Sequence, residues 1–452
     1  MKHATTLTNI SKKLSEELLS DKELCDKLLW GNLYDFELEA RSMCLDIFNN
    51  LMQIVLPVLS ERVCQRHRLR YKKAGVKKYR CRMQTIELHT GYRVSVPDLY
   101  AKSVKADFSG KRHLLVSYWS IEANCSPLRL SQVSMSSVLS PSYHTANELM
   151  SSFGIHQSGS RVRKITQKFA QVCADHEVDL SLTNQESLAN KRVVISIDGG
   201  RTRTRYYDQC EQATDLRKAS YQTPWCEPKL FVIQTLGADG KIDSKSLPIY
   251  GVRFGERDIL ALLKSYLKRL GIEKATSIQL VADGALWIWN QLPALLEELG
   301  VEAKRVIETL DYAHAAGYVH KLVDSLPKKV SPTKKKEYRE SFLSQLWKGD
   351  ALGIVAECKK LFTRPSKEVK TWINYLKKHA NRMQYHHFKA NKQLCGSGIV
   401  ESGIRRIISL RFKNPSTFWY KDNVESLFFL RAVCLSKRWN ILIKNFVSFE
   451  YY

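Results

Sequence analysis

The chain has 452 residues, enough for roughly two to four domains of about 100–200 residues each. Hydrophobic residues make up 44% and charged residues 26% of the sequence, a balance typical of globular proteins that excludes a disordered chain. The 71 Lys and Arg outnumber the 45 Asp and Glu, which gives a net charge of +26. This excess indicates a polyanionic partner, nucleic acid first and an acidic membrane surface second.

No uninterrupted apolar run approaches the roughly 18 residues that span a bilayer, and residues 1–20 are polar and lack a signal-peptide core. We therefore expect a cytoplasmic protein. The 11 cysteines are odd in number and form no Cys-x-x-Cys pair, so reduced and mostly buried thiols are expected. Cys64, His67 and Cys81 are alternative zinc ligands, but their spacing is irregular and no fourth ligand is evident.

Residues 1–120 are expected to form a mixed, basic, DNA-binding N-terminal region. Residues 1–60 read as helical, with apolar residues at helical spacing over 48–55, and Pro57 marks the expected helix end. A basic stretch covers 66–82. Alternating apolar residues on either side of Thr90-Gly91 predict a hairpin, and residues 111–120 predict a further strand.

Residues 121–190 are expected to hold a helix-turn-helix. Two apolar stripes at helical spacing are separated by a short turn that contains Gly154. The stripes are Ala146, Leu149, Met150 and Phe153, then Val162, Ile165 and Phe169. The turn and second helix present side chains suited to base edges and phosphates: Gln157, Ser158, Ser160, Arg161, Arg163 and Lys164. The alternative is an ordinary helical hairpin with a solvated basic face.

Residues 191–311 predict an α/β fold, with elements in the order β, β, β, α, β, α, β. The expected strands cover 192–198, 229–236, 247–253, 278–283 and 305–311, and the expected helices cover 256–270 and 287–299. Residues 312–395 read as an all-α insertion with lysine clusters. Residues 396–452 follow as the last part of the core, with an amphipathic helix over 397–412 and a long apolar helix over 424–439.

Three acids are candidates for a metal site. Asp198 and Asp283 each end an apolar strand and are followed by Gly, which would remove bulk so that a ligand backbone can approach. Glu401, in the predicted helix over 397–412, is the third candidate. Carboxylates suit Mg²⁺ or Mn²⁺, and two such ions can drive phosphoryl displacement. The alternatives are a turn-forming Asp-Gly-Gly at Asp198 and an i, i+4 salt bridge between Glu401 and Arg405.

An ordered set of motifs over roughly residues 140–440 resembles the DDE transposases of bacterial insertion sequences, within the mutator-like group. The matching segments are DGG at 198–200, VADGALWIW at 281–289, LDYAHAAGYV at 310–319, NRMQYHHF at 381–388 and GSGIVESGIRR at 396–406. The tail RFKNPSTFWYKDNVESLFFLRAV also resembles that of the family. One departure is the segment 414–419, where only Trp419 matches the family's string after the glutamate helix.

The resemblance implies an RNase H-like mixed-sheet core with an all-α insertion, and a triad of Asp198, Asp283 and Glu401. It implies a transposase that binds the terminal inverted repeats of an insertion sequence as double-stranded DNA. Two Mg²⁺ or Mn²⁺ ions would support hydrolysis at the element ends and joining of the 3′-OH to target DNA. A homodimer or higher assembly on DNA, associated with the nucleoid, is then expected. The alternatives are another RNase H-like nuclease, such as a junction resolvase, and an inactive DNA-binding regulator.

Asp311 and His314 resemble the family's Cys/Asp-x-x-His signature. They are expected to support the site, with Asp311 capping a helix and His314 as its hydrogen-bond partner, or with His314 touching the scissile phosphate. Trp287 and Trp289 could stack on an unpaired base, but we expect them in the hydrophobic core.

Overall fold

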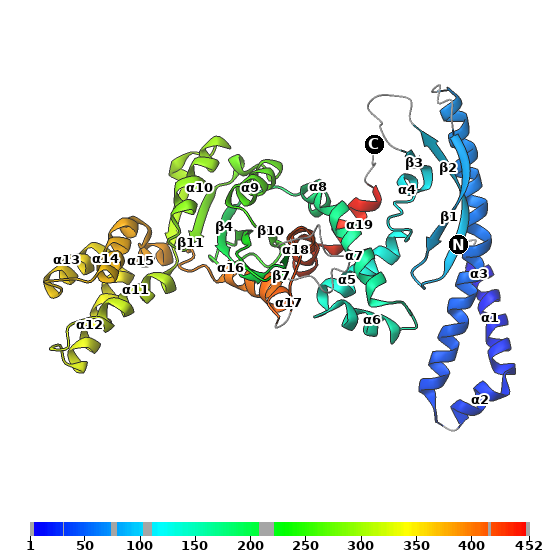
Figure 1. Cartoon of the computed structure of the whole chain (residues 1–452), viewed down its shortest axis with the longest axis horizontal. Coiled ribbons are helices and arrows are strands. Elements are labelled where there is room, and N and C mark those ends of the chain that lie inside the picture. The colour runs from blue at the N-terminus through cyan, green and yellow to red at the C-terminus, as the bar shows by residue number, and fades with distance from the viewer. Residues whose placement is uncertain are drawn as a thin grey trace. The chain divides into compact units, whose positions relative to one another are not determined.

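The computed structural model describes residues 4–29, 31–73, 79–102, 111–207, 221–414 and 417–448. The chain divides into two compact units, and Figure 1 shows the elements of both. The first unit holds residues up to Ser137 together with Tyr143–Phe169. The second holds Val138–Ser142 and Ala170–Ser448. Each unit is described by itself below.

The first unit begins with helices and continues with an antiparallel sheet. Its elements are α1 (Ala4–Ser20), α2 (Lys22–Leu29), α3 (Leu33–Lys73), β1 (Tyr79–Glu87), β2 (Arg93–Lys102), β3 (Lys111–His113), α4 (Leu114–Tyr118), α5 (Pro127–Leu139), α6 (Tyr143–Ser151) and α7 (Gly159–Ala174). The hairpin predicted around Thr90-Gly91 is confirmed, because β1 pairs with β2 on either side of this turn. The basic stretch over 66–82 lies partly outside the described residues.

Two predictions in this unit are wrong. The helix expected to end at Pro57 continues as α3 to Lys73. Phe48, Met52 and Leu56 pack on the core of the β1–β2 sheet, and this packing outweighs the hydrogen bond that proline removes. The strand expected over 111–120 ends at His113, because the Asp98 carboxylate accepts a hydrogen bond from the Leu115 N–H, at 3.0 Å, and starts α4.

The helix α3 is apolar on two sides. Opposite its sheet-facing residues it exposes a second row of apolar side chains, Ile47, Leu51, Ile54 and Val58. Within the described residues, α3 is the one helix long and apolar enough over Leu33–Arg68 to cross a membrane by length and composition alone. Because polar residues interrupt its apolar ones, no unbroken run in the sequence indicates this property. By itself it is weak evidence for a membrane span.

The predicted pair of helices is present as α6 and α7, with the turn between them containing Gly154 at a φ of 75°. Ala146 and Met150 of the first apolar stripe are buried. The other two members, Leu149 and Phe153, are exposed. All three apolar residues of the second stripe are buried, so α7 is anchored more firmly than α6.

The second unit is built on a five-stranded mixed sheet, and this confirms an α/β fold. The strands are β4 (Arg192–Gly199), β9 (Lys229–Leu236), β10 (Ile249–Arg253), β11 (Ser277–Ala282) and β12 (Val306–Leu310). Their order is β10-β9-β4-β11-β12. β9 runs antiparallel to both β10 and β4, whereas β4, β11 and β12 are parallel. The sequence predicted all five strands, but not their neighbours in the sheet.

Four two-residue strands lie between β4 and β9 and were not predicted. They are β5 (Thr202–Arg203), β6 (Tyr206–Tyr207), β7 (Tyr221–Gln222) and β8 (Trp225–Cys226). β5 pairs with β8 and β6 pairs with β7, both antiparallel. These pairs are too short to show the alternation of apolar and polar residues by which a strand is recognised in a sequence.

The two faces of the sheet are covered by different helices. Val193, Ile195 and Ile197 of β4 point to the face that packs in one core with α9 (Glu256–Leu270) and α10 (Leu286–Glu298). Val194 points to the other face, where it packs with Val281 and with Ile399 of α16 (Gly398–Gly403). Because side chains alternate along a strand, this assignment decides where the side chains at the strand ends point.

Residues 312–395 are all described and contain no strand, as predicted. Their helices are α11 (Tyr312–Asp324), α12 (Pro332–Lys348), α13 (Ala351–Leu361), α14 (Lys367–His379) and α15 (Tyr385–Ala390). The short α8 (Glu177–Ser181) precedes the sheet, and 3₁₀ turns lie at η1 (Ile272–Lys274), η2 (Ala303–Arg305) and η3 (Ala380–Arg382). The five helices share one hydrophobic core with the sheet, so they are not a separately folded body.

The last part of the chain is helical. After α16 the helix widens into the π-helical segment η4 (Ile404–Ser409) and continues into α17 (Leu410–Phe412). The helix predicted over 424–439 is divided into α18 (Lys421–Leu435) and α19 (Trp439–Ser448). Lys437 has a φ of 62°, a left-handed conformation that ends the first helix before the second begins.

Candidate active site

Three aspartates stand in a row at one edge of the sheet. In the parallel pairs, Ile197 of β4 lies opposite Ala282 of β11, and Ala282 lies opposite Leu310 of β12. Asp198, Asp283 and Asp311 are the next residues along these strands. Adjacent parallel strands therefore place three carboxylates side by side at their carboxyl ends, which is the edge where α/β sheets bind ligands.

The fourth acid, Glu401, is on the helix that covers the same face of the sheet. Asp198 lies an even number of residues after Val194, and Asp283 an even number after Val281, so in each strand the two side chains point to the same face of the sheet. Both valines face α16. The helix lies close to the end of β4, because a Cβ at Gly200 would stand 2.8 Å from Cδ1 of Ile408. Glu401 is in the first turn of α16 and is exposed.

Asp311 is buried and accepts four hydrogen bonds. Its Oδ1 accepts from the backbone N–H of His314, at 2.7 Å, and lies 3.2 Å from Nδ1 of the same residue. Its Oδ2 accepts from the Ser397 backbone N–H, at 2.6 Å, and from the Ser397 hydroxyl, at 2.9 Å. Asp311 is thus the N-cap of α11 and also ties that helix to the start of α16.

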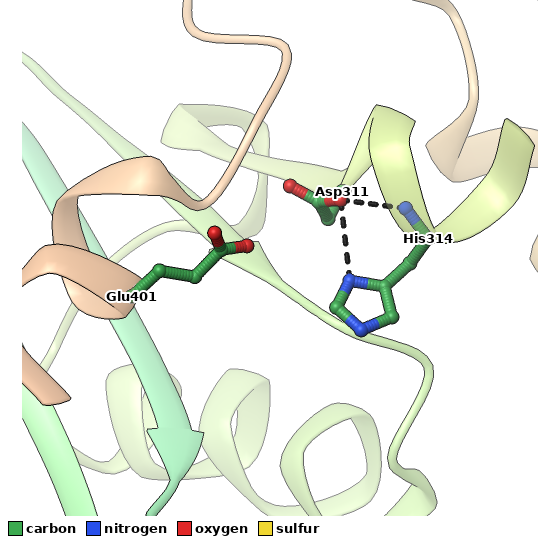
Figure 2. Close-up of side chains that lie close together, drawn as sticks. All are labelled: Asp311, His314 and Glu401. Carbon is green, nitrogen blue, oxygen red and sulfur yellow. Dashed lines mark hydrogen bonds and ion pairs between the residues drawn. The ribbon is translucent and has the colours of Figure 1, made fainter. Parts of the chain in front are cut away.

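Glu401 is held towards Asp311 through Ser397. The Ser397 hydroxyl lies 3.1 Å from Oε1 of Glu401, and Figure 2 shows the Glu401 carboxylate turned towards Asp311 and His314. Ligand atoms of Asp311, His314 and Glu401 lie within 4.8 Å of one another, so these residues could hold a metal ion. Within the described residues they form the single such group, and it does not include Asp198 or Asp283.

The carboxylates differ in how many of their hydrogen-bond acceptor sites are already used. A carboxylate has about four acceptor sites, and in Asp311 all four are used by His314 and Ser397. Oδ1 of Asp198 accepts only from the N–H of Gly199, at 2.6 Å, and Oδ1 of Asp283 only from the N–H of Ala285, at 2.9 Å. Among the described residues, Oδ2 of Asp198 and of Asp283 has no such partner. Asp198 and Asp283 therefore have capacity for a cation that Asp311 lacks.

The charges of the site act on one another. Burial raises the pKa of Asp198 to about 6, with the charges of Asp283 and Glu401 acting in the same direction. The N–H of Gly199 and the nearby His314 oppose this rise. A carboxyl group that resists ionisation beside other carboxylates is typical of a site prepared for a cation.

His314 and Asp311 are shifted in opposite directions. The hydrogen bond to Asp311 raises the pKa of His314, and the charges of Asp283 and Asp198 add to the rise. Burial of Asp311 favours its neutral form, but the hydrogen bonds from His314 and Ser397 outweigh burial and hold its pKa well below the usual range. At neutral pH Asp311 is therefore a charged acceptor that orients its neighbours.

Metal binding at Asp198 is expected to depend on pH. The pKa of Asp198 is raised to about 6, so its carboxyl group still holds a proton at pH values where an ordinary aspartate is ionised. Below about pH 6 this proton competes with the cation. The affinity for Mn²⁺, measured by calorimetry, should fall as the pH is lowered from 7.5 through 6. In the Asp198→Asn variant, whose residual affinity is weaker, this pH dependence should be much reduced. An equal pH dependence in both proteins would exclude Asp198 as the titrating ligand.

The glycines beside the aspartates were predicted to leave room for a ligand, and in this structure protein side chains lie beside both of them. A Cβ at Gly199 would stand 2.1 Å from Oε1 of Glu227, and one at Gly284 would stand 2.1 Å from Cε2 of Tyr375. The space beside these glycines is therefore filled by the protein's own side chains. At Gly284 glycine is needed for close packing against the Tyr375 ring, whereas at Gly199 the neighbour is the end of the flexible Glu227 side chain.

Two predicted alternatives are decided by packing. Trp289 is only 6% exposed and packs in the core, and its Nε1 donates to the Asp283 carbonyl, at 2.6 Å, which holds the backbone at that acid. Trp287 packs against the same core.

Cys64 is buried with its thiol directed at the Pro97 carbonyl, and Cys81 is exposed. Within the described residues, no metal-ligand group includes these cysteines.

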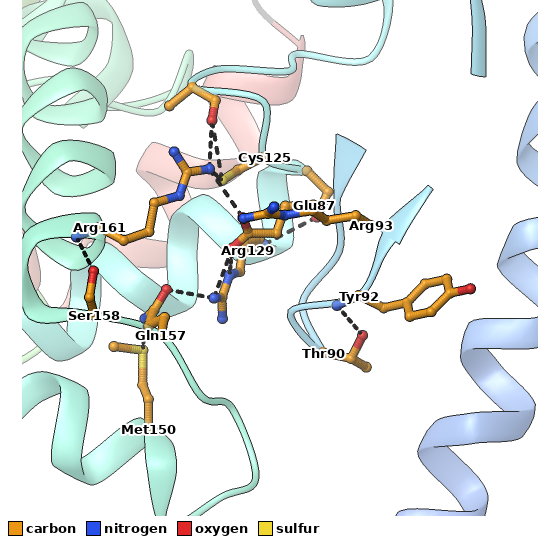
Figure 3. A network of polar contacts seen from close by, with 12 residues as sticks. Glu87, Thr90, Tyr92, Arg93, Cys125, Arg129, Met150, Gln157, Ser158 and Arg161 are labelled. Carbon is orange, nitrogen blue, oxygen red and sulfur yellow. Dashed lines mark hydrogen bonds and ion pairs between the residues drawn. The ribbon is translucent and has the colours of Figure 1, made fainter. Parts of the chain in front are cut away.

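Four of the six residues predicted to bind DNA are exposed on the turn and α7, namely Ser158, Ser160, Arg163 and Lys164. The other two turn inwards. Arg161 donates from Nη2 to Oε2 of Glu87, at 3.1 Å, and Oε1 of Gln157 accepts from Arg129, at 2.6 Å. Figure 3 shows these side chains converging on Glu87.

Glu87 is the centre of a buried charge network. It is 4% exposed and pairs through Oε1 with Arg129, which is 1% exposed, at 3.0 Å from Nε. Glu87→Gln should lower the free energy of unfolding of the first unit by about 3–5 kcal/mol, because it leaves a buried guanidinium without its counter-charge. Urea denaturation checks this, with Glu122→Gln as the near-neutral control. Glu122 is partly exposed and pairs weakly with the exposed Lys168, at 3.9 Å.

Sequence reasoning missed Ser397, which joins Asp311 to Glu401. A serine directly before a helix is normally recognised as an N-cap, and Ser397 does precede α16. Its side chain, however, makes no capping bond in that helix and donates to an acid 86 residues earlier in the chain. The local signal therefore indicates the position of Ser397 but not its role.

Comparisons with known proteins give a likeness among solved structures. No protein-family model matches the sequence, and no curated protein matches it. The chain is similar to a chain of the Drosophila P element transposase strand transfer complex, with 14% sequence identity and a TM-score of 0.26. The likeness covers 72% of this chain and 82% of that one.

Proposed function

We propose that the protein is a DDE transposase with an RNase H-like core, and that Asp198, Asp283 and Glu401 are its catalytic acids. One observation carries the proposal. Two acids with spare acceptor capacity end adjacent parallel strands, and the third lies on the helix over the same face. The strand order β10-β9-β4-β11-β12, in which β9 alone runs antiparallel to both of its neighbours, supports the RNase H-like arrangement.

The donor set fits hard divalent ions. Asp198, Asp283 and Glu401 offer carboxylate oxygens, which are the ligands that Mg²⁺ and Mn²⁺ prefer. Bound there, a pair of such ions would activate water and stabilise the charge that develops on a phosphodiester. The Glu401 side chain would have to exchange its contact with Ser397, at 3.1 Å, for the ions. We propose that a rotation about the Glu401 side-chain bonds makes this exchange.

The residues around the acids have positioning roles in this proposal. Asp311 fixes the starts of both α11 and α16 and thereby the place from which Glu401 acts. His314 is exposed and has a raised pKa, so near neutral pH it supplies positive charge beside the acids. A cation at that point would attract a DNA phosphate towards the carboxylates, which by themselves would repel it.

The same acids serve two steps in the proposed reaction. In the first, a water attacks the phosphodiester at the element end and the departing 3′ oxygen leaves as a 3′-OH. In the second, that 3′-OH attacks a target phosphodiester, so one bond forms as another breaks. The net charge of +26 favours the DNA complex. Because two ends are joined, we propose a homodimer or higher assembly on DNA, in the cytoplasm with the nucleoid.

The test uses the full chain and duplexes from the DNA on either side of its coding region. With Mg²⁺ the protein should nick these duplexes at the element ends and join the resulting 3′-OH to a plasmid. Cleavage of branched junctions without joining would instead identify a junction resolvase. Binding without cleavage in Mg²⁺ or Mn²⁺ would identify an inactive DNA-binding regulator, and would contradict the proposal.

A further inference from the structure

A polar recess of about 450 Å³ lies in the first unit. It is lined by the hairpin at Arg93, by Arg129 of α5 and by the start of α7, including Ser158, Ser160 and Lys164. All of these elements belong to one compact unit. The recess therefore has walls that are fixed relative to one another.

The recess has an excess of positive charge. Arg93, Arg129, Arg161 and Lys164 line it, and the one carboxylate among the lining residues is Glu87. Glu87 is already engaged by Arg129 and Arg161, at 2.9 and 3.1 Å. Its single charge cannot neutralise four cations, so an anion in the recess would be attracted by those that remain.

Two residues that line the recess, Arg129 and Arg161, each carry a buried donor that lacks an acceptor. Nη1 of Arg129 and Nε of Arg161 are buried and have no hydrogen-bond partner among the described residues. The Arg129 side chain is only 1% exposed, so bulk water does not solvate this group. Buried polar groups are nearly always hydrogen-bonded, and an unpaired one next to a cavity indicates a missing partner.

The helix α7 adds further donors. It starts at Gly159 and is 16 residues long, and helix starts of this kind bind anions through their free N–H groups and their dipole. Ser158 takes the N–H of Arg161, at 3.2 Å. The hydroxyls of Ser158 and Ser160, 3.5 Å apart, stand at the mouth of the recess as additional donors.

We infer that this recess binds a phosphate group, and that in the working protein it is a phosphate of the DNA backbone. The inference deepens the proposed function and rests on its DNA partner. It changes the role of the predicted DNA-binding residues, since Gln157 and Arg161 build the wall of a phosphate site and do not read base edges. Phosphate contacts fix the register of a protein on DNA without reading its sequence.

The test compares Lys164→Glu, inside the recess, with Arg163→Glu, the adjacent exposed residue outside it. The probes are inorganic phosphate and a short duplex of arbitrary sequence, at constant ionic strength. Phosphate should raise the unfolding midpoint of the wild type and of Arg163→Glu but not of Lys164→Glu. Lys164→Glu should weaken duplex binding at least about tenfold and reduce its salt slope by about one to two, since the change alters two charges.

Equal behaviour of the two variants with both probes would overturn the inference. Loss of phosphate binding in Lys164→Glu, with duplex binding equal to that of the wild type, would also overturn it, since the site would then serve a free phosphate or mononucleotide. Unfolding midpoints without phosphate show that both variants fold. Mn²⁺ binding at the acids of the second unit should be unchanged in both, and this separates failure of the inference from failure of the proposed function.

Discussion

Asp283→Asn should reduce metal-dependent DNA cleavage by at least about a thousandfold, because the loss of one metal ligand removes about 4 kcal/mol of transition-state stabilisation. Asn keeps the oxygen that accepts the Ala285 N–H, so the local turn should survive. Asp198→Asn should have the same effect on cleavage. DNA binding, measured by fluorescence anisotropy, should remain within about twofold of the wild type, because the exchange removes a metal ligand and no cationic DNA contact.

Asp239→Asn is the matched control for this prediction. Oδ1 of Asp239 accepts the N–H of Lys241, two residues later, at 3.0 Å, just as Oδ1 of Asp283 accepts the N–H of Ala285. Asp239 is exposed in the loop after β9, which lies at the other edge of the sheet from the acids because β9 runs antiparallel to β4. Full cleavage is expected in this variant. Full cleavage by Asp198→Asn or Asp283→Asn in Mg²⁺ would show that the acids are not catalytic.

Asp311→Asn should lower the free energy of unfolding of the second unit by about 2–4 kcal/mol, which is the second large effect. An amide has one acceptor oxygen, so it cannot take hydrogen bonds on both sides from His314 and Ser397. Its NH₂ group would face an N–H donor on one side. The same substitution at Asp198 should raise stability at pH 7, because it removes a half-buried charge whose pKa is raised to about 6.

Asp311 and Asp198 contribute to the free energy of unfolding with opposite dependence on pH. The lowered pKa of Asp311 contributes stability above the ordinary aspartate value, and this contribution is lost as the pH falls below it. The raised pKa of Asp198 costs stability above that value, with the full cost reached above about pH 6. Denaturant titrations at pH 7 and pH 4.5 should therefore show the gain from Asp198→Asn shrinking at the lower pH. A gain that grew on acidification would contradict the assignment.

Local sequence was sufficient for the elements that carry two of the acids. Apolar runs that end in an acid predict both Asp198 and Asp283 at strand ends, and the structure has β4 and β11 there. Their adjacency was not predictable from spacing, because it depends on the pairing of β4 with β11. Asp311 becomes the third acid in the row only through the pairing of β11 with β12.

The remaining features depend on partners that are distant in the sequence. Ser397 meets Asp311 across 86 residues, and Arg161 turns inwards to pair with the buried Glu87, 74 residues away. Pro57 lies inside α3 because apolar packing on the sheet continues past it. Hydrophobic periodicity and turn residues predict only local structure, whereas these contacts join residues that are far apart in the sequence.

The most direct measurement is a crystal structure of the protein with Mn²⁺ and a cleaved element end, with the ions located by anomalous scattering. The account predicts Mn²⁺ between Asp198 and Asp283, with Glu401 turned from Ser397 to the ions and Asp311 still bonded to His314 and Ser397. Ions ligated by Asp311 and His314, with Asp198 and Asp283 left without metal, would contradict it.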